Sequence, residues 1–355
     1  MKWWSCSTIL HRVRSGWIIC LSLLLAACSR GPESVLHDYA ERVARVVEQP
    51  LAEPASVALP TLALRELELP LAKADVGLLE FLRLNVCELG MAVGKKNSTL
   101  GKVAPPSQRM HMERDFLLLA PDCVAQLQDS RPELSNKLQQ ALQLKQSQRL
   151  QQWWNAWLTA KEWQQFISSA AAPLEMTGDE PAHLSRSLQA LDYAIAQGQR
   201  WQQQDYVYNS SDMEFHQQQL LLGETLGKWL HAQALQTDVL NRVAQVLEQR
   251  YAEKPLCMTG QQTDKAKILF TVFQKFYLAQ VQPYMSRSDQ LGQQLLADLT
   301  ALQSTLQQQN ITVPKAYQQW LAQLQQRQQG FTRASQRHVY AWRTTLTECG
   351  FIPGQ

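Results

Sequence analysis

Apolar residues recur every three or four positions along most of this chain. Between residues 33 and 48, for example, Leu36, Tyr39 and Val43 follow one another at the spacing of one helix face. The same periodicity predicts further helices over 76–93, 108–120, 132–147, 149–168, 183–202, 212–235, 237–251, 264–282, 289–307, 314–329 and 332–348. We therefore predict an all-α fold, a multi-helix bundle.

One stretch breaks this pattern. Pro50, Pro54, Pro60 and Pro70 follow the first predicted helix, and proline at this frequency is incompatible with a helix because it lacks the backbone donor. We predict a Pro-rich extended segment that lies over the bundle, with one short strand over residues 62–69.

The first residues have the features of an export signal. Lys2, Arg12 and Arg14 precede an apolar run over residues 17–27, which is about half the length of a membrane-spanning helix. The run ends in Leu-Ala-Ala followed by Cys28, which resembles the lipobox of bacterial lipoproteins. That resemblance implies that residues 1–27 are removed as a signal peptide and that Cys28 carries the lipid. The alternative is an ordinary secretory signal, in which Cys28 would follow the apolar run by chance and carry no lipid.

The rest of the chain, residues 28–355, is predicted to form a single large helical domain with two lobes divided near residue 130. Ser29 follows the lipid-bearing cysteine, and in Gram-negative lipoproteins the lack of Asp at that position favours the outer membrane. We therefore expect the domain to face the periplasm from the inner leaflet of the outer membrane.

The charge balance changes when the signal peptide is removed. Residues 1–27 hold three basic and no acidic residues, so 31 Lys and Arg remain against 31 Asp and Glu in the rest of the chain. A formally neutral domain does not have the charge of a nucleic-acid-binding protein, and we expect no nucleic-acid partner.

Four cysteines follow Cys28, and four cysteines allow three pairings. We favour Cys87–Cys123 and Cys257–Cys349, because each pair then lies within its own half of the chain. The first pair would clip an N-terminal helical hairpin, since a reversing loop over residues 94–107 would bring the two cysteines together. No CxxC motif is present to support a redox role.

The segment GKKNSTLGKVAPPSQ, residues 94–108, has the letters of a phosphate-binding loop. The spacing of its glycines does not match the P-loop motif, and the preceding element is a predicted helix where the motif needs a strand. Its basic residues are a candidate anion-binding set for a phospholipid, a lipopolysaccharide or a carboxylate: Lys95, Lys96, Lys102 and Arg109. The favoured interpretation is a solvated connection whose Asn, Ser and Thr satisfy backbone groups at helix ends.

Other candidate chemistry is sparse. His111 and Glu113 match the H-x-E of zinc deaminases, but the P-C-x-x-C that must follow is missing, so we predict no metal site and no cofactor. No G-x-S-x-G or S-x-x-K marks a nucleophile. Four tryptophans lie between residues 153 and 163, and His338 lies on an apolar stripe. We expect all five to be core residues rather than a stacking platform or a ligand.

The stretch from residue 82 to residue 123, LRLNVCELGMAVGKKNSTLGKVAPPSQRMHMERDFLLLAPDC, resembles the signature of the bacterial domain-of-unknown-function family 3080. Members of that family are Gram-negative proteins labelled as lipoproteins, and the resemblance implies no activity. The features that carry it are Cys87, Asn97-Ser98, Leu100-Gly101-Lys102, Ser107, Arg109 and Cys123. The later stretch TGQQTDKAKILFTVFQKFYLAQVQPYM, residues 259–285, agrees as well, so we expect the resemblance to span most of the chain after the signal peptide.

The function predicted from these features is that of a lipid-anchored envelope protein that binds or scaffolds without catalysis. Its expected partners are the membrane, through the lipid anchor, and an unidentified envelope protein, glycan or lipid. The alternative is an envelope hydrolase that acts on peptidoglycan or lipid through a site assembled only in three dimensions.

Overall fold

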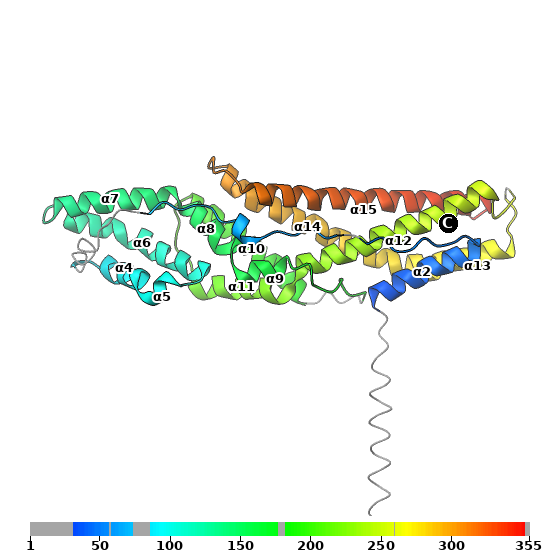
Figure 1. Cartoon of the computed structure of the whole chain (residues 1–355), viewed down its shortest axis with the longest axis horizontal. Helices are drawn as coiled ribbons and strands as arrows, with labels where there is room; N and C mark the ends of the chain where they lie inside the picture. Colours follow the sequence, from blue (N-terminus) through cyan, green and yellow to red (C-terminus); the bar gives the residue numbers. More distant parts are fainter. Residues whose placement is uncertain (1–30, 57, 74–85, 177–181, 259, 352–355) are drawn as a thin grey trace, which may run out of the picture.

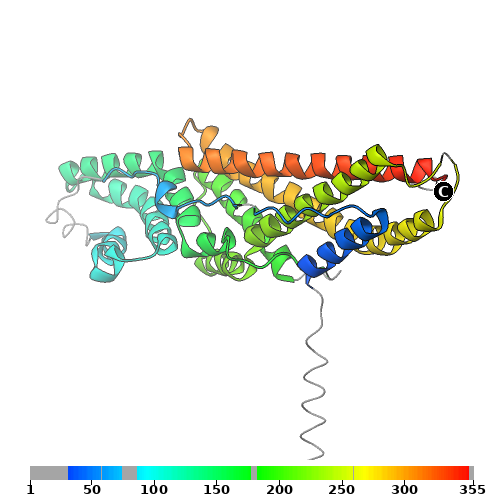
Figure 2. The same cartoon turned by 45° about the vertical axis from the view of Figure 1, so that its right-hand side comes forward.

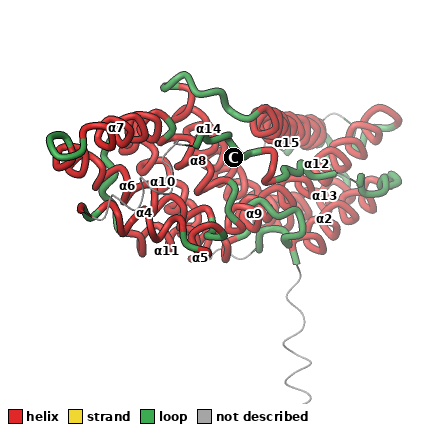
Figure 3. Tube along the Cα trace, turned by 60° about the vertical axis from the view of Figure 1, so that its left-hand side comes forward, coloured by secondary structure: helices red, strands yellow, loops and turns green. Residues whose placement is uncertain are grey.

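The computed structural model describes residues 31–56, 58–73, 86–176, 182–258 and 260–351. These residues form helices joined by short connections and contain no strand, which confirms the all-α prediction (Figure 3). The helices form an elongated bundle, with the long α15 along the upper edge of the view in Figure 1. The predicted division into two lobes near residue 130 stays a prediction.

The helices fall into three groups along the bundle (Figure 1). One end holds α4 (Leu89–Asn97), α5 (Thr99–Lys102), α6 (Pro106–Leu127) and α7 (Pro132–Ser147). The middle holds α8 (Arg149–Leu158), α9 (Lys161–Phe166), α10 (Ala182–Gln202) and α11 (Ser210–Gly223). The other end is made by α2 (Pro32–Val47), α12 (Thr225–Glu253), α13 (Asp264–Val272), α14 (Gln282–Gln307) and α15 (Lys315–Glu348).

One large cluster of buried apolar side chains runs through all three groups. At the α2 end, it encloses three hydrogen-bonded aromatic side chains. The Tyr39 hydroxyl lies 2.7 Å from Nε2 of His338, and the Trp342 indole nitrogen donates to the Tyr39 hydroxyl at 2.8 Å. His338 is fully buried, so the prediction of a core histidine is confirmed.

The Pro-rich segment crosses the bundle as an extended strap, which we define as residues 48–56 and 58–73 (Figure 2). Along α12, the Arg242 guanidinium donates to the Ala52 carbonyl at 3.0 Å and Asp238 accepts from the Ala55 amide at 3.1 Å. At α8, the Asn155 side chain both accepts from the Leu69 amide and donates to its carbonyl, each at 2.8 Å. The extended segment is therefore present as predicted, and side chains satisfy its backbone.

The strand predicted over residues 62–69 is wrong. A short 3₁₀ helix, η1 (Leu64–Glu66), occupies this stretch. No neighbouring strand offers a ladder here; instead the Trp154 indole donates to the Leu67 carbonyl at 2.8 Å. Leu67 and Leu69 of this stretch are buried against the helices.

Several helix ends differ from the predicted ones. Pro121 lies inside α6 instead of in a turn, and Gly330 lies inside α15 instead of at its end. The break predicted near residue 236 occurs at Glu224, whose backbone is left-handed with φ of 48°. The predicted helix over 264–282 continues through a π-helical stretch, η3 (Phe273–Val281), into α14.

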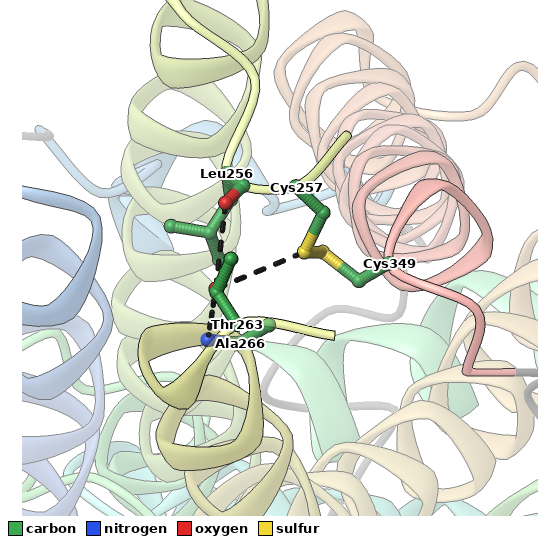
Figure 4. The surroundings of a disulfide bond; sticks show 5 residues. All are labelled: Leu256, Cys257, Thr263, Ala266 and Cys349. Atoms are coloured by element: carbon green, nitrogen blue, oxygen red, sulfur yellow. Dashed lines mark hydrogen bonds between the residues drawn. A yellow bond between two sulfur atoms is a disulfide. The ribbon is translucent and has the colours of Figure 1, made fainter. Parts of the chain in front are cut away.

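Both predicted disulfides are present. Cys87 and Cys123 have their Cα atoms 5.6 Å apart, and those of Cys257 and Cys349 are 5.1 Å apart. The first bond ties the start of α4 to α6, the helical hairpin we expected. The second ties the α12–α13 connection to the end of α15, beside Thr263, whose hydroxyl accepts from the Ala266 amide at the start of α13 (Figure 4).

Candidate functional site

The basic segment predicted as a loop is mostly helical. α4 extends to Asn97, and Ser98 then caps α5: its hydroxyl accepts from the Gly101 amide at 3.0 Å and donates to the Lys95 carbonyl at 2.7 Å. A Cβ at Gly101 would lie 2.3 Å from the Lys96 carbonyl oxygen, so only glycine allows α5 to pack on the end of α4. The predicted role of Ser98 at a helix end is confirmed.

Lys96 belongs to a buried ionic cluster. Its ammonium and that of Lys145 on α7 each donate to one carboxylate oxygen of Glu113 on α6. Burial alone would raise the pKa of Glu113, but the two ammonium groups outweigh it and hold that pKa below its usual value. Burial also lowers the pKa of Lys145, to about 8. The cluster joins three helices, and it gives Lys96 a carboxylate partner within the protein.

His111 lies apart from Glu113 and does not share its partners. Its Nδ1 is 2.7 Å from the Tyr208 hydroxyl, and its Nε2 is 3.6 Å from Glu214 of α11. Burial lowers the pKa of His111, and the positive charge of Arg114 adds to this effect. The H-x-E match therefore forms no joint site. Among the described residues, no group of three or more His, Cys, Asp and Glu side chains could hold a metal ion.

The remaining basic residues lie on the surface. Lys95, Lys102 and Arg109 are exposed, and the Arg109 guanidinium donates to the Ala104 carbonyl at 2.8 Å. Neither Lys95 nor Lys102 forms an ion pair with any described residue. These three cations are exposed on α4, α5 and the first turn of α6, whereas Lys96 is paired with Glu113.

Large apolar side chains are exposed beside these cations. Met91 on α4 is 77% exposed, Leu100 on α5 is 81% exposed and Val103 directly after α5 is 74% exposed. We define the α4–α5 corner as Met91, Lys95, Leu100, Lys102 and Val103. Isolated exposed apolar side chains are normal, but an exposed apolar group at one site indicates an interaction surface.

The tryptophans form no such surface. Trp153, Trp154, Trp157 and Trp163 are each at most 1% exposed, which confirms the prediction of core residues. Three of them donate their indole N–H to acceptors on neighbouring segments: the Ala194 carbonyl, the Leu67 carbonyl and the Gln197 side chain. They therefore contribute to packing between α8, α10 and the strap.

The structure also has a cleft of about 360 Å³ between α10 and α14. Its lining includes Ser185, Asp192, Tyr284, Arg287 and Ser288, but two of these polar groups already have partners. The Tyr284 hydroxyl donates to the Leu174 carbonyl at 2.8 Å, and Arg287 donates to the Met176 carbonyl at 2.7 Å. Neither serine in the lining has a histidine beside it in that lining, so the described residues present no nucleophile–base pair there.

One carboxyl group near this cleft has an altered acidity. Burial raises the pKa of Asp298 to about 7, and the negative charge of Asp192 adds to the shift. The carboxyl oxygen Oδ2 of Asp298 is enclosed and has no hydrogen-bond partner among the described residues. Asp298 lies outside the lining of the cleft, so a bound molecule in the cleft would not contact it directly.

Comparison with known proteins identifies the family. One family model matches residues 36–353, nearly the whole chain. The chain belongs to the family described as "Protein of unknown function (DUF3080)". The match begins within α2 and continues past the end of α15, which confirms the expected DUF3080 resemblance over most of the chain. Searches of curated proteins and of solved structures returned no match.

Cys28 and the predicted signal peptide lie outside the described residues. Within the described part, no helix is both long enough and apolar enough to span a membrane. Sequence reasoning missed Lys145, Asn155 and Asp298. The signal for Asn155 and Asp298 was a polar residue on an otherwise apolar helix stripe, while Lys145 carried no such mark.

Proposed function

We propose that this DUF3080 chain is a lipid-anchored protein of the bacterial cell envelope whose helical body binds or scaffolds an envelope component without catalysing a reaction. Cys28 carries the lipid, and the body faces the periplasm from the inner leaflet of the outer membrane. The two disulfides support an oxidising compartment, since such bonds persist outside the reducing cytosol.

The observation that carries the binding role is the α4–α5 corner. It combines apolar side chains that are more than 70% exposed with lysines that have no ion pair among the described residues. The largest polar groups of the α10–α14 cleft, in contrast, are held by hydrogen bonds to backbone carbonyls. The corner presents its exposed lysines to a partner, and the described lining of the cleft presents no nucleophile–base pair. Both observations favour binding over catalysis.

A second candidate is an envelope hydrolase that acts on peptidoglycan or lipid, and one observation favours it. Glycosidases use a carboxyl group of raised pKa as their general acid, and burial raises the pKa of Asp298 to about 7. The enclosed position of Asp298 weighs against this role. Incubation with peptidoglycan or phospholipid, followed by mass spectrometry of the products, separates the two candidates. Products that disappear in an Asp298→Asn variant would establish the hydrolase.

Lipid attachment at Cys28 is tested by mass spectrometry of the protein purified from membranes. We expect an amino terminus at Cys28 with acyl chains on it, and we expect a Cys28→Ala variant to lack them. An intact, unacylated terminus on the parent protein would exclude the lipoprotein assignment. The binding role is tested by crosslinking in intact cells, where recovery of no envelope component would contradict it.

A further inference from the structure

We infer that the α4–α5 corner is a second membrane-contact site, which docks on an anionic phospholipid surface beside the lipid anchor. This inference rests on the proposed anchoring through Cys28, because the anchor determines which edge of the bundle lies near the membrane. It goes beyond that function because it assigns a ligand, the anionic head groups, to named residues of the folded body.

The charge of the corner fits such a surface. Residues 89–112 contain four Lys and Arg residues and no Asp or Glu. Glu113 pairs with Lys96 and Lys145, whereas Lys95, Lys102 and Arg109 are exposed. The negative surface potential of anionic lipids attracts basic residues that lie near the membrane, and this attraction falls off within a Debye length.

The apolar part of the corner distinguishes a lipid surface from a protein partner. Met91, Leu100 and Val103 alternate with lysines, whose long stems can lie along the apolar layer while their ammonium groups stay at the head groups. Interfacial membrane-binding segments have this mixture of apolar and basic residues. Protein–protein interfaces, by comparison, are depleted of lysine.

The position of the corner agrees with anchoring at the amino terminus. The start of α2, α5 and α11 all lie along the lower edge of the bundle, whereas α15 runs along the upper edge, and the three views agree (Figures 1, 2 and 3). Cys28 precedes Pro32 by four residues, a span of at most about 14 Å. A membrane that holds the lipid of Cys28 therefore lies close to the lower edge.

Two large apolar side chains are also exposed on α11, a helix that lies along the lower edge in Figure 1. Phe215 is 52% exposed and Leu222 is 58% exposed, and their spacing of seven residues puts them on one face of the helix. The docked molecule would lie with its long axis along the membrane, held at α2 by the lipid and at α5 by the corner.

The test uses the full chain purified from membranes and reconstituted into vesicles of phosphatidylcholine, with or without phosphatidylglycerol. A Leu100→Cys variant carries a bimane label, which reports an apolar environment by a blue shift of its emission. The four described cysteines are paired, so the introduced thiol is the target, and the unsubstituted protein gives the labelling background. Val339→Cys, a half-exposed position on α15, the helix that runs along the upper edge, is the matched control.

We expect a blue shift at position 100 only in vesicles that contain phosphatidylglycerol, and none at position 339. A Lys95→Gln, Lys102→Gln double substitution should abolish the shift, as should salt near 1 M, where the Debye length is about 3 Å. Both lysines are exposed, so these substitutions leave the packing intact.

Flotation of the same samples distinguishes anchoring through Cys28 from membrane contact by the α4–α5 corner. Protein that floats with both kinds of vesicle but shows no shift at position 100 is anchored, and the corner does not contact lipid; the inference is then overturned and the anchor stands. Protein that floats only with phosphatidylglycerol, with the shift, binds through the corner and lacks the anchor. Protein that floats with neither overturns both.

Discussion

The disulfide between Cys257 and Cys349 allows a quantitative prediction about stability. We expect replacement of both cysteines by serine to destabilise the protein without changing the folded helices. The bond joins the α12–α13 connection to the end of α15, and other contacts hold the same place. The Gly260 amide donates to the Glu348 carbonyl at 2.9 Å, and the Phe351 ring stacks on Phe270 with centroids 4.5 Å apart.

The magnitude follows from the loop that the bond closes. Cys257 and Cys349 are 92 residues apart, and a crosslink over that distance restricts the unfolded chain by about 5 kcal/mol in the chain-entropy model. Cys87 and Cys123 are 36 residues apart, for which the same relation predicts about 4 kcal/mol. The longer loop should therefore contribute about 1 kcal/mol more than the shorter one.

Equilibrium unfolding in guanidinium chloride, followed by the fluorescence of the buried tryptophans, measures this difference. The matched control is the double serine variant of Cys87 and Cys123. Reduction of the parent protein should reproduce the sum of the two losses. A loss below about 1 kcal/mol on removal of the longer crosslink would refute the reasoning, because the unfolded chain would then be restricted by other means.

Three further predictions concern buried polar groups. Asn155→Ala leaves the Leu69 amide and carbonyl without partners, so we expect a loss of about 2–4 kcal/mol in urea unfolding and faster proteolysis of the strap. Glu113→Gln removes a buried carboxylate and leaves the partly buried Lys145 without its counter-charge, so it should cost about 3–5 kcal/mol by the same measurement, whereas substitution of the exposed Lys102 by Gln should change stability little. Burial lowers the pKa of His338 to about 3, below its ordinary 6.5, so between these values the unfolded chain binds a proton that the folded chain does not. Stability should therefore fall as the pH drops below 6.5, by between about 1 and 2 kcal/mol per pH unit, and a His338→Gln variant should lack this part of the slope.

The helical fold was predictable because its signal is local. The apolar stripe of each helix depends only on residues three and four positions apart, so all main helices within the described ranges were found. The disulfide pairing was also predictable, since each half of the chain held two cysteines. The part of the helix predicted over 76–93 that precedes residue 86 lies outside the described residues.

Helix ends were less predictable because tertiary packing decides them. Pro121 would end an isolated helix, but Leu117, Ala120 and Cys123 around it are buried, and this packing continues α6 through the proline. Gly330 lies in open space, where a Cβ would meet only Arg333 at 3.9 Å. Gly330 therefore does not end the helix, and the buried apolar stripe of α15 continues on both sides of it.

The chemistry of the candidate site was predictable only in part. The four basic residues of the candidate set were visible in the sequence, but the partner of Lys96 was not. Glu113 follows Lys96 by 17 residues and precedes Lys145 by 32, distances at which no local rule pairs charges. The exposure of Leu100 and Val103 was equally invisible, because apolar residues in a predicted loop do not indicate which side faces solvent.

The strap connects α2 to helices in other parts of the bundle. It leaves α2 at Glu48, where Lys265 of α13 pairs with that carboxylate at 2.5 Å, and it ends on α8 at Asn155. Between these points it is bonded to α12, and the Arg327 guanidinium of α15 donates to its Ala58 carbonyl. Four elements are thus tied to one extended segment that begins at Glu48, at the C-terminal end of α2, the helix that an anchored amino terminus would enter at Pro32. A body joined to its anchor through a free linker could rotate, whereas the strap holds α2 in a fixed orientation relative to α8 in the middle of the bundle. For that reason, release of the strap by Asn155→Ala should weaken the lipid contact at Leu100 although the two residues belong to different helices.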